Sequence, residues 1–250
     1  MKSQSIKARF DALTATLAQD SAALRFAPPV AHVYRPLEYA RQAHDEYVAK
    51  YAGLGAKVLL LGMNPGPFGM CQTGIPFGDV ALVRDWLGID SGVLRPRAEH
   101  PSRPILGFES TRREVSGTRL WGWAQQKFGS PERFFREHFV WNYCPLAFLE
   151  KSGRNRTPDK LPRSEREALF EVCDDALRSV VKALGARLVV GIGRFAGQRA
   201  RAARLGAGVE IGDAPHPSPA SPAANRGWSG MFEAALIQAG VMLPTDSGID

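Results

Sequence analysis

The sequence predicts a single α/β domain, a three-layer α/β/α sandwich with a central four-stranded parallel sheet. Short apolar runs typical of buried parallel strands alternate with longer segments of helical periodicity. Several of these runs end in turns rich in glycine and proline, which neither a helix nor a strand could continue through. With 250 residues, the chain is long enough to bury a substantial core in one such domain.

The first half of the chain begins with two helices and then a buried strand. Apolar residues recur at helical spacing between residues 5 and 25, and Pro28-Pro29 ends this first helix. A second helix at residues 39–51 leads into a strand at residues 58–61. Residues 90–119 are rich in glycine, proline and arginine and have no clean period, so we expect a long surface excursion. Its arginines either face phosphates or are simply solvated; they occupy positions 95, 97, 103, 112, 113 and 119.

The remaining elements follow from the same patterns. Strands are expected at residues 139–146 and 187–192 and just before residue 212. Helices are expected at residues 80–87, 120–128, 131–138, 163–184, 196–205 and 230–240. We therefore expect one domain over residues 26–243, preceded by a helical extension at 1–25 and followed by a loose tail at 244–250.

The composition narrows the class of protein. Hydrophobic residues make up 44% and charged residues 23%, which is ordinary for a globular domain, and no apolar run is long enough to span a membrane. Three scattered cysteines, Cys71, Cys144 and Cys173, form neither a disulfide framework nor a zinc motif. The formal charge of +7 favours a polyanionic partner such as nucleic acid. We expect no metal or other cofactor, a monomer, and a cytoplasmic location near the nucleoid in a bacterium or a nuclear one in a eukaryote.

Three polar side chains follow strand ends in the predicted sheet. Asn64 lies in an Asn-Pro-Gly-Pro turn after the first strand, Asn142 lies near the end of the second, and His216 stands between prolines after the last. Because the carboxyl ends of parallel strands meet at one edge of a sheet, we expect all three to face one crevice. Each alone is more often a structural residue, but three at one edge favour a site.

These residue types restrict the chemistry. An amide is no useful general base at neutral pH, so Asn64 could orient a water molecule but hardly deprotonate it. Such a weak nucleophile suits a reaction in which the leaving group departs early. His216 could stabilise negative charge on that leaving group, as an oxyanion-type donor. Hydrolysis of an N-glycosidic bond fits, because an oxocarbenium-like sugar forms while the departing base carries the charge.

Four segments resemble those of the single-strand-selective monofunctional uracil-DNA glycosylases. They are GMNPGPFGMCQTGIPFG at 62–78, NYCPL at 142–146, SGRNRTP at 152–158 and HPSPASPAANRGW at 216–228. The resemblance extends from about residue 36 to residue 243. It implies the uracil-glycosylase sandwich fold, DNA as the partner, and removal of uracil in base-excision repair.

The resemblance also implies a role for each site residue. Asn64 would position the hydrolytic water, and His216 would stabilise the base anion at O2. Asn142 would read the uracil edge, and the flipped base would stack on Phe77. Met63, together with Phe77, would offer backbone N–H groups to the base. Gly66 would leave space beside C5, which implies that 5-hydroxymethyluracil is accepted.

A further segment resembles the wedge that fills the gap left by a flipped base. It comprises Pro219, Ala220, Ser221, Pro222, Asn225, Arg226, Gly227 and Trp228. Vertebrate members of the family carry an arginine where this chain has Ala220. We therefore hypothesise a stronger preference for single strands, which need no wedge. The site motifs contain no lysine that could form a Schiff base, so we expect base release without strand cleavage.

Three other functions remain open on the sequence alone. Gly191, Gly193 and Gly197 after a strand resemble a dinucleotide fingerprint, but their spacing is GxGxxxG and no acidic residue ends a strand some 20 residues later. A non-catalytic sensor of damaged or single-stranded DNA would bind tightly without releasing a base. The same fold could also act mainly on deaminated purines such as xanthine or hypoxanthine.

Overall fold

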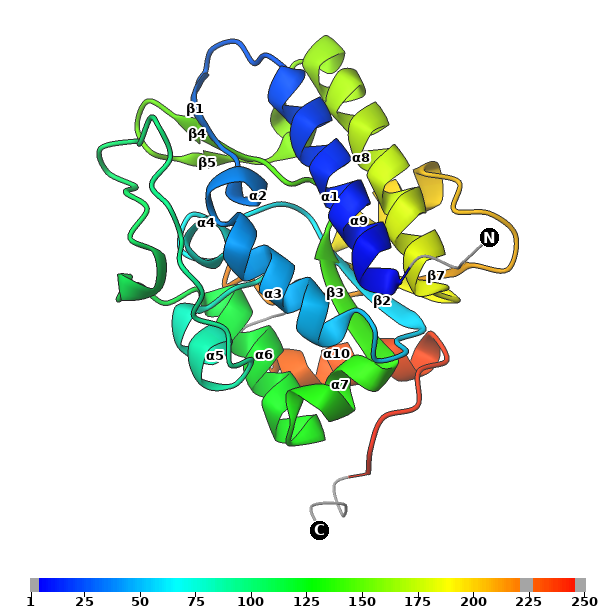
Figure 1. Cartoon of the computed structure of the whole chain (residues 1–250). Coiled ribbons are helices and arrows are strands. Elements are labelled where there is room, and N and C mark those ends of the chain that lie inside the picture. The colour runs from blue at the N-terminus through cyan, green and yellow to red at the C-terminus, as the bar shows by residue number, and fades with distance from the viewer. Residues whose placement is uncertain (1–4, 221–226, 246–250) are drawn as a thin grey trace.

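A computed structural model of the protein describes residues 5–220 and 227–245. Its centre is a four-stranded parallel sheet in the order β3-β2-β6-β7 (Figure 1). The strands are β2 (Val58–Gly62), β3 (His138–Asn142), β6 (Leu188–Ile192) and β7 (Glu210–Ala214). The three inner-core strands β2, β3 and β6 are covered on both faces, which explains their continuous apolar runs. The predicted α/β sandwich is confirmed.

Helices cover both faces of this sheet. One face carries α1 (Ile6–Ala23), α3 (Arg41–Tyr51), α8 (Arg163–Leu184) and α9 (Arg194–Ala202); the other carries α6 (Val115–Phe128) and α10 (Trp228–Gln238), and α7 (Pro131–Glu137) packs beside β3. Strand β3 shows the division, because its side chains alternate. The Trp141 ring contacts Phe10 of α1 at 6.0 Å, whereas the His138 ring packs on Phe134 at 5.1 Å.

Helix α1 is an integral part of the core rather than an extension. It lies beside α8 in Figure 1 and buries Phe10, Leu13 and Leu17 in the same cluster as the sheet residues. Ser5 caps its first turn by accepting a hydrogen bond from the backbone N–H of Ala8. The N-terminal helix was expected, but its place in the fold was not.

A second, antiparallel sheet was missed by the sequence analysis. It has the order β1-β4-β5, with β1 (Val30–Tyr34), β4 (Ala147–Glu150) and β5 (Asn155–Arg156). The single strand expected at 139–146 is wrong: the chain leaves the parallel sheet at Asn142 and enters the antiparallel one at Ala147. Both strands are apolar, so no change of pattern marks the turn between them.

The excursion after α5 (Val80–Asp85) is irregular, as expected, but it is held at several points. The Tyr34 hydroxyl donates to the Arg103 carbonyl at 2.6 Å and accepts from the His100 N–H at 2.8 Å. The Gln72 side chain accepts from the Leu106 N–H at 2.8 Å. Its short helical turns, and those nearby, are α2 (Pro36–Tyr39), α4 (Met70–Thr73), η1 (Gly107–Glu109) and η2 (Pro158–Lys160). None of the helices in the described ranges could cross a membrane.

Candidate active site

A cavity of about 390 Å³ opens at the carboxyl ends of the parallel strands. Asn64 follows β2, Asn142 ends β3, and His216 follows β7, and all three line this cavity. The residues expected to contact the base line it as well: Met63, Gly66, Phe77 and Asn142. The structure therefore brings both expected catalytic side chains and the expected base-binding residues to one cavity, as parallel topology requires.

Asn64 is anchored through its amide nitrogen. Its Nδ2 lies 3.3 Å from the carbonyl oxygen of Leu146 and donates to it, which ties the turn after β2 to the segment before β4. A second bond of 3.3 Å goes to the carbonyl of Pro65. Within the described part of the chain, no hydrogen bond reaches Oδ1. The side chain is thus oriented with one acceptor left for a ligand or a water molecule.

His216 is held as a neutral hydrogen-bond donor. The backbone N–H of Ser218 donates to His216 Nδ1 at 3.0 Å, so the proton of the neutral ring lies on Nε2. Burial lowers the pKa of His216 to about 4, because desolvation disfavours the imidazolium. At neutral pH the ring therefore offers an Nε2–H donor without a positive charge.

The backbone on both sides of His216 is fixed. Trp228 Nε1 donates to the Pro215 carbonyl at 2.8 Å, and Arg119 donates to the Pro217 carbonyl at 2.7 Å. Gly193, at φ +90°, approaches from β6: an added β-carbon there would lie 3.1 Å from His216 Cβ. These contacts hold the imidazole against the cavity from three directions.

Phe77 and Asn142 meet at Gly62, the last residue of β2. A β-carbon on Gly62 would lie 2.3 Å from Asn142 Oδ1 and 2.7 Å from Phe77 Cε2, so only glycine permits this arrangement. Asn142 Nδ2 donates to the Met70 sulfur at 3.2 Å, a weak acceptor that a ligand oxygen could replace. The requirement for glycine at the end of the strand was missed by the sequence analysis.

The backbone of Phe77 is strained. It is a non-glycine residue in the left-handed region, with φ +54°, and its ring centroid lies 6.0 Å from that of His216. The Asp79 N–H donates to the Phe77 carbonyl at 2.7 Å, and a β-carbon on Gly117 of α6 would lie 1.9 Å from the same oxygen. Strain of this kind persists only where the surroundings enforce it, and it is concentrated at functional sites.

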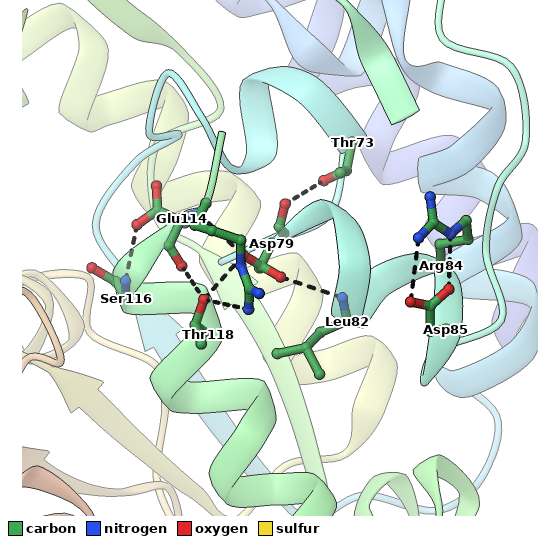
Figure 2. Close-up of polar contacts among 10 residues, drawn as sticks. Thr73, Asp79, Leu82, Arg84, Asp85, Glu114, Ser116 and Thr118 are labelled. Carbon is green, nitrogen blue, oxygen red and sulfur yellow. Dashed lines mark hydrogen bonds and ion pairs between the residues drawn. The ribbon is translucent and has the colours of Figure 1, made fainter. Parts of the chain in front are cut away.

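Asp79 is the buried centre that holds this loop against the start of α6 (Figure 2). Its Oδ2 accepts from the Glu114 N–H at 3.1 Å and from the Thr118 hydroxyl at 3.0 Å. The Arg113 guanidinium completes the shell at 2.9 Å. Its other oxygen caps α5 by accepting from the Leu82 N–H.

Glu114 is a carboxylate in the cavity wall that the sequence analysis missed. Its Oε1 accepts from the Ser116 N–H at 3.1 Å and so caps α6 (Figure 2). Its Oε2 faces the turn after β2: a β-carbon on Gly66 would lie 2.7 Å from this atom, and one on Gly69 would lie 3.1 Å away. Burial raises the pKa of Glu114, against the opposing effect of hydrogen bonds from Ser116 and Gly117. The space beside Gly66 is therefore occupied by a carboxylate.

Other cavity residues come from segments to which the sequence analysis gave no role. Asn155 and Thr157 reach the cavity from the β4–β5 hairpin, within the SGRNRTP segment. Asn155 Oδ1 is buried and makes no hydrogen bond with the described residues. The remaining lining residues are Pro67, Gly69, Met70, Ser116 and Ser218.

The arginines of the excursion divide into two groups. Arg113 and Arg119 are used internally, on Asp79 and on the Pro217 carbonyl, so the expectation that they face phosphates does not hold for their guanidiniums here. Arg103 and Arg112 instead lie over the ring of Phe68, with guanidinium carbons 5.4 and 4.8 Å from its centroid.

The expected wedge is only partly described. Pro219 and Ala220 are exposed, whereas Ser221, Pro222, Asn225 and Arg226 lie outside the described residues. Gly227 precedes α10. Trp228 differs from the expectation, because its side chain is only 4% exposed and stacks on Phe232 at 4.6 Å. The Trp228 ring belongs to the core and supports His216 from behind.

The glycines that suggested a dinucleotide site serve packing. A β-carbon on Gly191 would lie 2.2 Å from the Gly197 nitrogen, and one on Gly197 would lie 1.7 Å from Asp213 Oδ1. They allow α9 to lie directly on β6 and β7. Among the described residues, no group of three or more His, Cys, Asp or Glu side chains could hold a metal ion.

Comparisons with known proteins agree with this geometry. The Uracil DNA glycosylase superfamily matches residues 49–237. The single-strand selective monofunctional uracil-DNA glycosylase of Rattus norvegicus is 52% identical over 228 residues, which is 90% of this chain and 82% of the relative. Its counterpart in Bos taurus is 52% identical over 221 residues, 88% of this chain and 81% of the relative. The crystal structure of Pedobacter heparinus SMUG2 matches 92% of this chain and 99% of its own with a TM-score of 0.63; at 18% identity it supports the fold alone.

Proposed function

Because this chain belongs to the Uracil DNA glycosylase superfamily, we propose that it is a base-excision repair enzyme that hydrolyses the N-glycosidic bond of uracil in DNA. The observation that carries this proposal is the meeting of Asn64, Asn142 and His216 with the Phe77 ring in one cavity. The formal charge of +7 suits a DNA substrate. The base must leave the stack to reach such a buried site.

The cavity offers a matching group for each part of a uracil base. Phe77 provides an aromatic face for stacking. The Asn142 amide can accept from N3–H and donate to O4, whereas cytosine presents the opposite pattern at both positions. A mismatched base would leave these buried groups unpaired, at a cost of about 1–3 kcal/mol for each group. His216 Nε2–H then donates to O2.

In the reaction, the C1′–N1 bond breaks and its electron pair moves into the base, where charge builds on N1 and O2. The neutral His216 donor stabilises that charge without transferring its proton. Asn64, fixed by the Leu146 carbonyl, accepts from the water whose oxygen forms the new bond to C1′. The water proton is released to solvent or to the base, and an abasic site remains.

We expect base release without strand cleavage. A bifunctional glycosylase needs an amine that forms a Schiff base with C1′. No lysine is among the described residues that line the cavity. Uracil in single- and double-stranded DNA and 5-hydroxymethyluracil are the proposed substrates, with single strands preferred because Ala220 offers little as a wedge.

The test is a base-release assay on single- and double-stranded oligonucleotides that carry uracil, 5-hydroxymethyluracil, xanthine or hypoxanthine. We expect uracil release, with strand breaks only after alkali. Breaks without alkali would contradict the monofunctional mechanism. Release of purines only would assign the site to deaminated purines, and binding without release of any base would make the protein a sensor.

A further inference from the structure

The inference concerns the wall formed by Gly66, Gly69 and Glu114, and it rests on the proposed function. Glu114 is the only acidic side chain among the described residues that line the cavity. One of its oxygens is used to cap α6, and the other, Oε2, faces the two glycines. A carboxylate is thus aimed at the part of the cavity where a side chain on Gly66 would otherwise stand.

The other contacts decide which edge of the base meets this wall. Phe77 takes a face of the ring, Asn142 takes N3 and O4, and His216 takes O2. The sugar is attached at N1. The edge that remains is C5–C6, and the wall that remains is the one that carries Glu114.

Space alone cannot give the selectivity that this enzyme needs. A cavity wide enough for a 5-hydroxymethyl group is also wide enough for a 5-methyl group, which is smaller. A glycosylase that acts on genomic DNA must nevertheless spare thymine. The distinction therefore requires a polar group at this wall, and Glu114 is the charged one.

We propose that Glu114 is a specificity-determining residue that reads the C5 substituent of the base. Its carboxylate accepts a hydrogen bond from the hydroxyl of a 5-hydroxymethyl group. Charge-assisted bonds of this kind are short and roughly twice as strong as neutral ones. A 5-methyl group would displace water from the carboxylate and return no hydrogen bond, which is costly for a partly buried charge. Uracil, with only hydrogen at C5, leaves room for a water molecule on Oε2.

The test uses 5-ethyluracil, because an ethyl group has the shape of a hydroxymethyl group but no hydroxyl. Single-turnover release would be measured from single-stranded oligonucleotides carrying uracil, 5-hydroxymethyluracil, 5-ethyluracil or thymine. We expect the wild-type enzyme to release 5-hydroxymethyluracil about 10- to 100-fold faster than 5-ethyluracil, the range that a hydrogen bond to a charged group provides. Equal rates in the wild-type protein would overturn the proposal whether or not any variant folds.

Two variants locate the effect at Glu114. Glu114→Ala should bring the ratio of 5-hydroxymethyluracil to 5-ethyluracil release close to one and raise thymine release relative to uracil. Glu114→Gln keeps an acceptor for the helix cap and should lose about tenfold in the same ratio. Glu109→Gln is the matched control, since Glu109 is exposed on the same excursion and away from the cavity.

The ratios separate this inference from the proposed function. Unchanged ratios in both Glu114 variants, with uracil still released, would refute the role of Glu114 alone. Absence of uracil release from the wild-type protein would refute the proposed function itself. A general loss of stability lowers all four rates together and leaves the ratios as they were.

Discussion

At the scale of single residues, the site depends on two side chains that are each fixed through one polar atom and offer another. Asn64 is held through its nitrogen and offers Oδ1; His216 is held through Nδ1 and offers Nε2–H. In both cases a backbone group of the protein decides which atom faces the cavity. A side chain with two polar atoms thereby acquires one defined chemical role.

Asn64→Ala removes the water acceptor without touching the groups that recognise the base. We expect base release in single-turnover assays to slow by about 10²-fold or more, because a misplaced nucleophile costs at least that much. Binding to uracil-containing DNA should remain close to that of the wild type. Wild-type release rates in the variant would contradict the role in positioning water.

His216→Ala should slow the chemical step by about 10²–10³-fold, the usual effect of losing one preorganised donor. His216→Gln restores an N–H donor and should recover part of the rate. Since the His216 pKa is lowered to about 4, its neutral form persists above that value. The pH profile of base release in the wild type should therefore show no inflection near 6.5 that disappears in His216→Gln. Such an inflection would indicate that the imidazolium is the active form.

At the scale of elements, the cavity is assembled by loops that are braced against helix starts. The Phe77 loop joins α6 through Asp79, and the His216 segment joins α6 and α10 through Arg119 and Trp228. Helix α6 thus supports both halves of the site. This explains how a strained residue and a buried imidazole stay in place between strand ends that are distant in sequence.

Asp79→Ala tests this bracing. It deprives the Glu114 N–H and the Thr118 hydroxyl of their acceptor and uncaps α5, so we expect a loss of about 1–3 kcal/mol in the free energy of unfolding. Base release should fall as well, because the Phe77 loop loses its anchor. Urea unfolding and single-turnover kinetics would measure the two effects.

Asp85→Asn is the matched control for that experiment. Asp85 is exposed and its pair with Arg84, at 2.8 Å, also appears in Figure 2. Exposed pairs contribute little, so its stability should change by no more than about 0.5 kcal/mol. Equal losses in the two variants would show that Asp79 is no special support.

The elements that were predicted well have strong patterns of their own. Helix α8 was placed at residues 163–184, where the structure has it, because its apolar positions follow the 3.6-residue period over six turns. The antiparallel sheet was missed because β1 is short and polar at its centre and because β4 continues an apolar run. Glu114 was missed for another reason: a carboxylate in an unpatterned loop gives no local signal of the wall that it reaches.

At the scale of the whole molecule, burial affects the response to acid. His44, His138 and His216 all have a pKa lowered to about 4, because desolvation opposes their charged forms. In the unfolded chain they titrate near 6.5. As the pH falls from 6.5 to 4, the unfolded state takes up protons that the folded state refuses, so stability falls. It is fully retained above about pH 6.5.

His138→Phe is the variant that tests this linkage. The His138 ring is fully buried and stacks on Phe134, so phenylalanine suits its surroundings. Each buried ring should cost the wild type about 2 kcal/mol at pH 5 relative to pH 7.5. Chemical unfolding at the two pH values should show a smaller acid loss in His138→Phe than in the wild type. The same loss in both proteins would refute the assignment to this ring.

The overall fold class and the meeting of three strand-end residues were predictable because topology determines both. Parallel strands bring their carboxyl ends to one edge, and the short apolar runs identify the strands. What could not be predicted depends on side-chain geometry in three dimensions. The glycine at position 62, the internal use of Arg113 and Arg119, and the burial of Trp228 are examples.

Glu114 has a consequence for how selectivity can change during evolution. The same carboxylate that borders the cavity beside Gly66 also begins a helix by capping it. Serine, aspartate and asparagine are better helix caps, but their side chains are shorter. A lineage that replaced Glu114 with one of them would keep the helix start and lose the carboxylate beside the glycines. Substrate range could thus broaden at little cost in stability, whereas regaining the narrower range would require this one long acidic side chain.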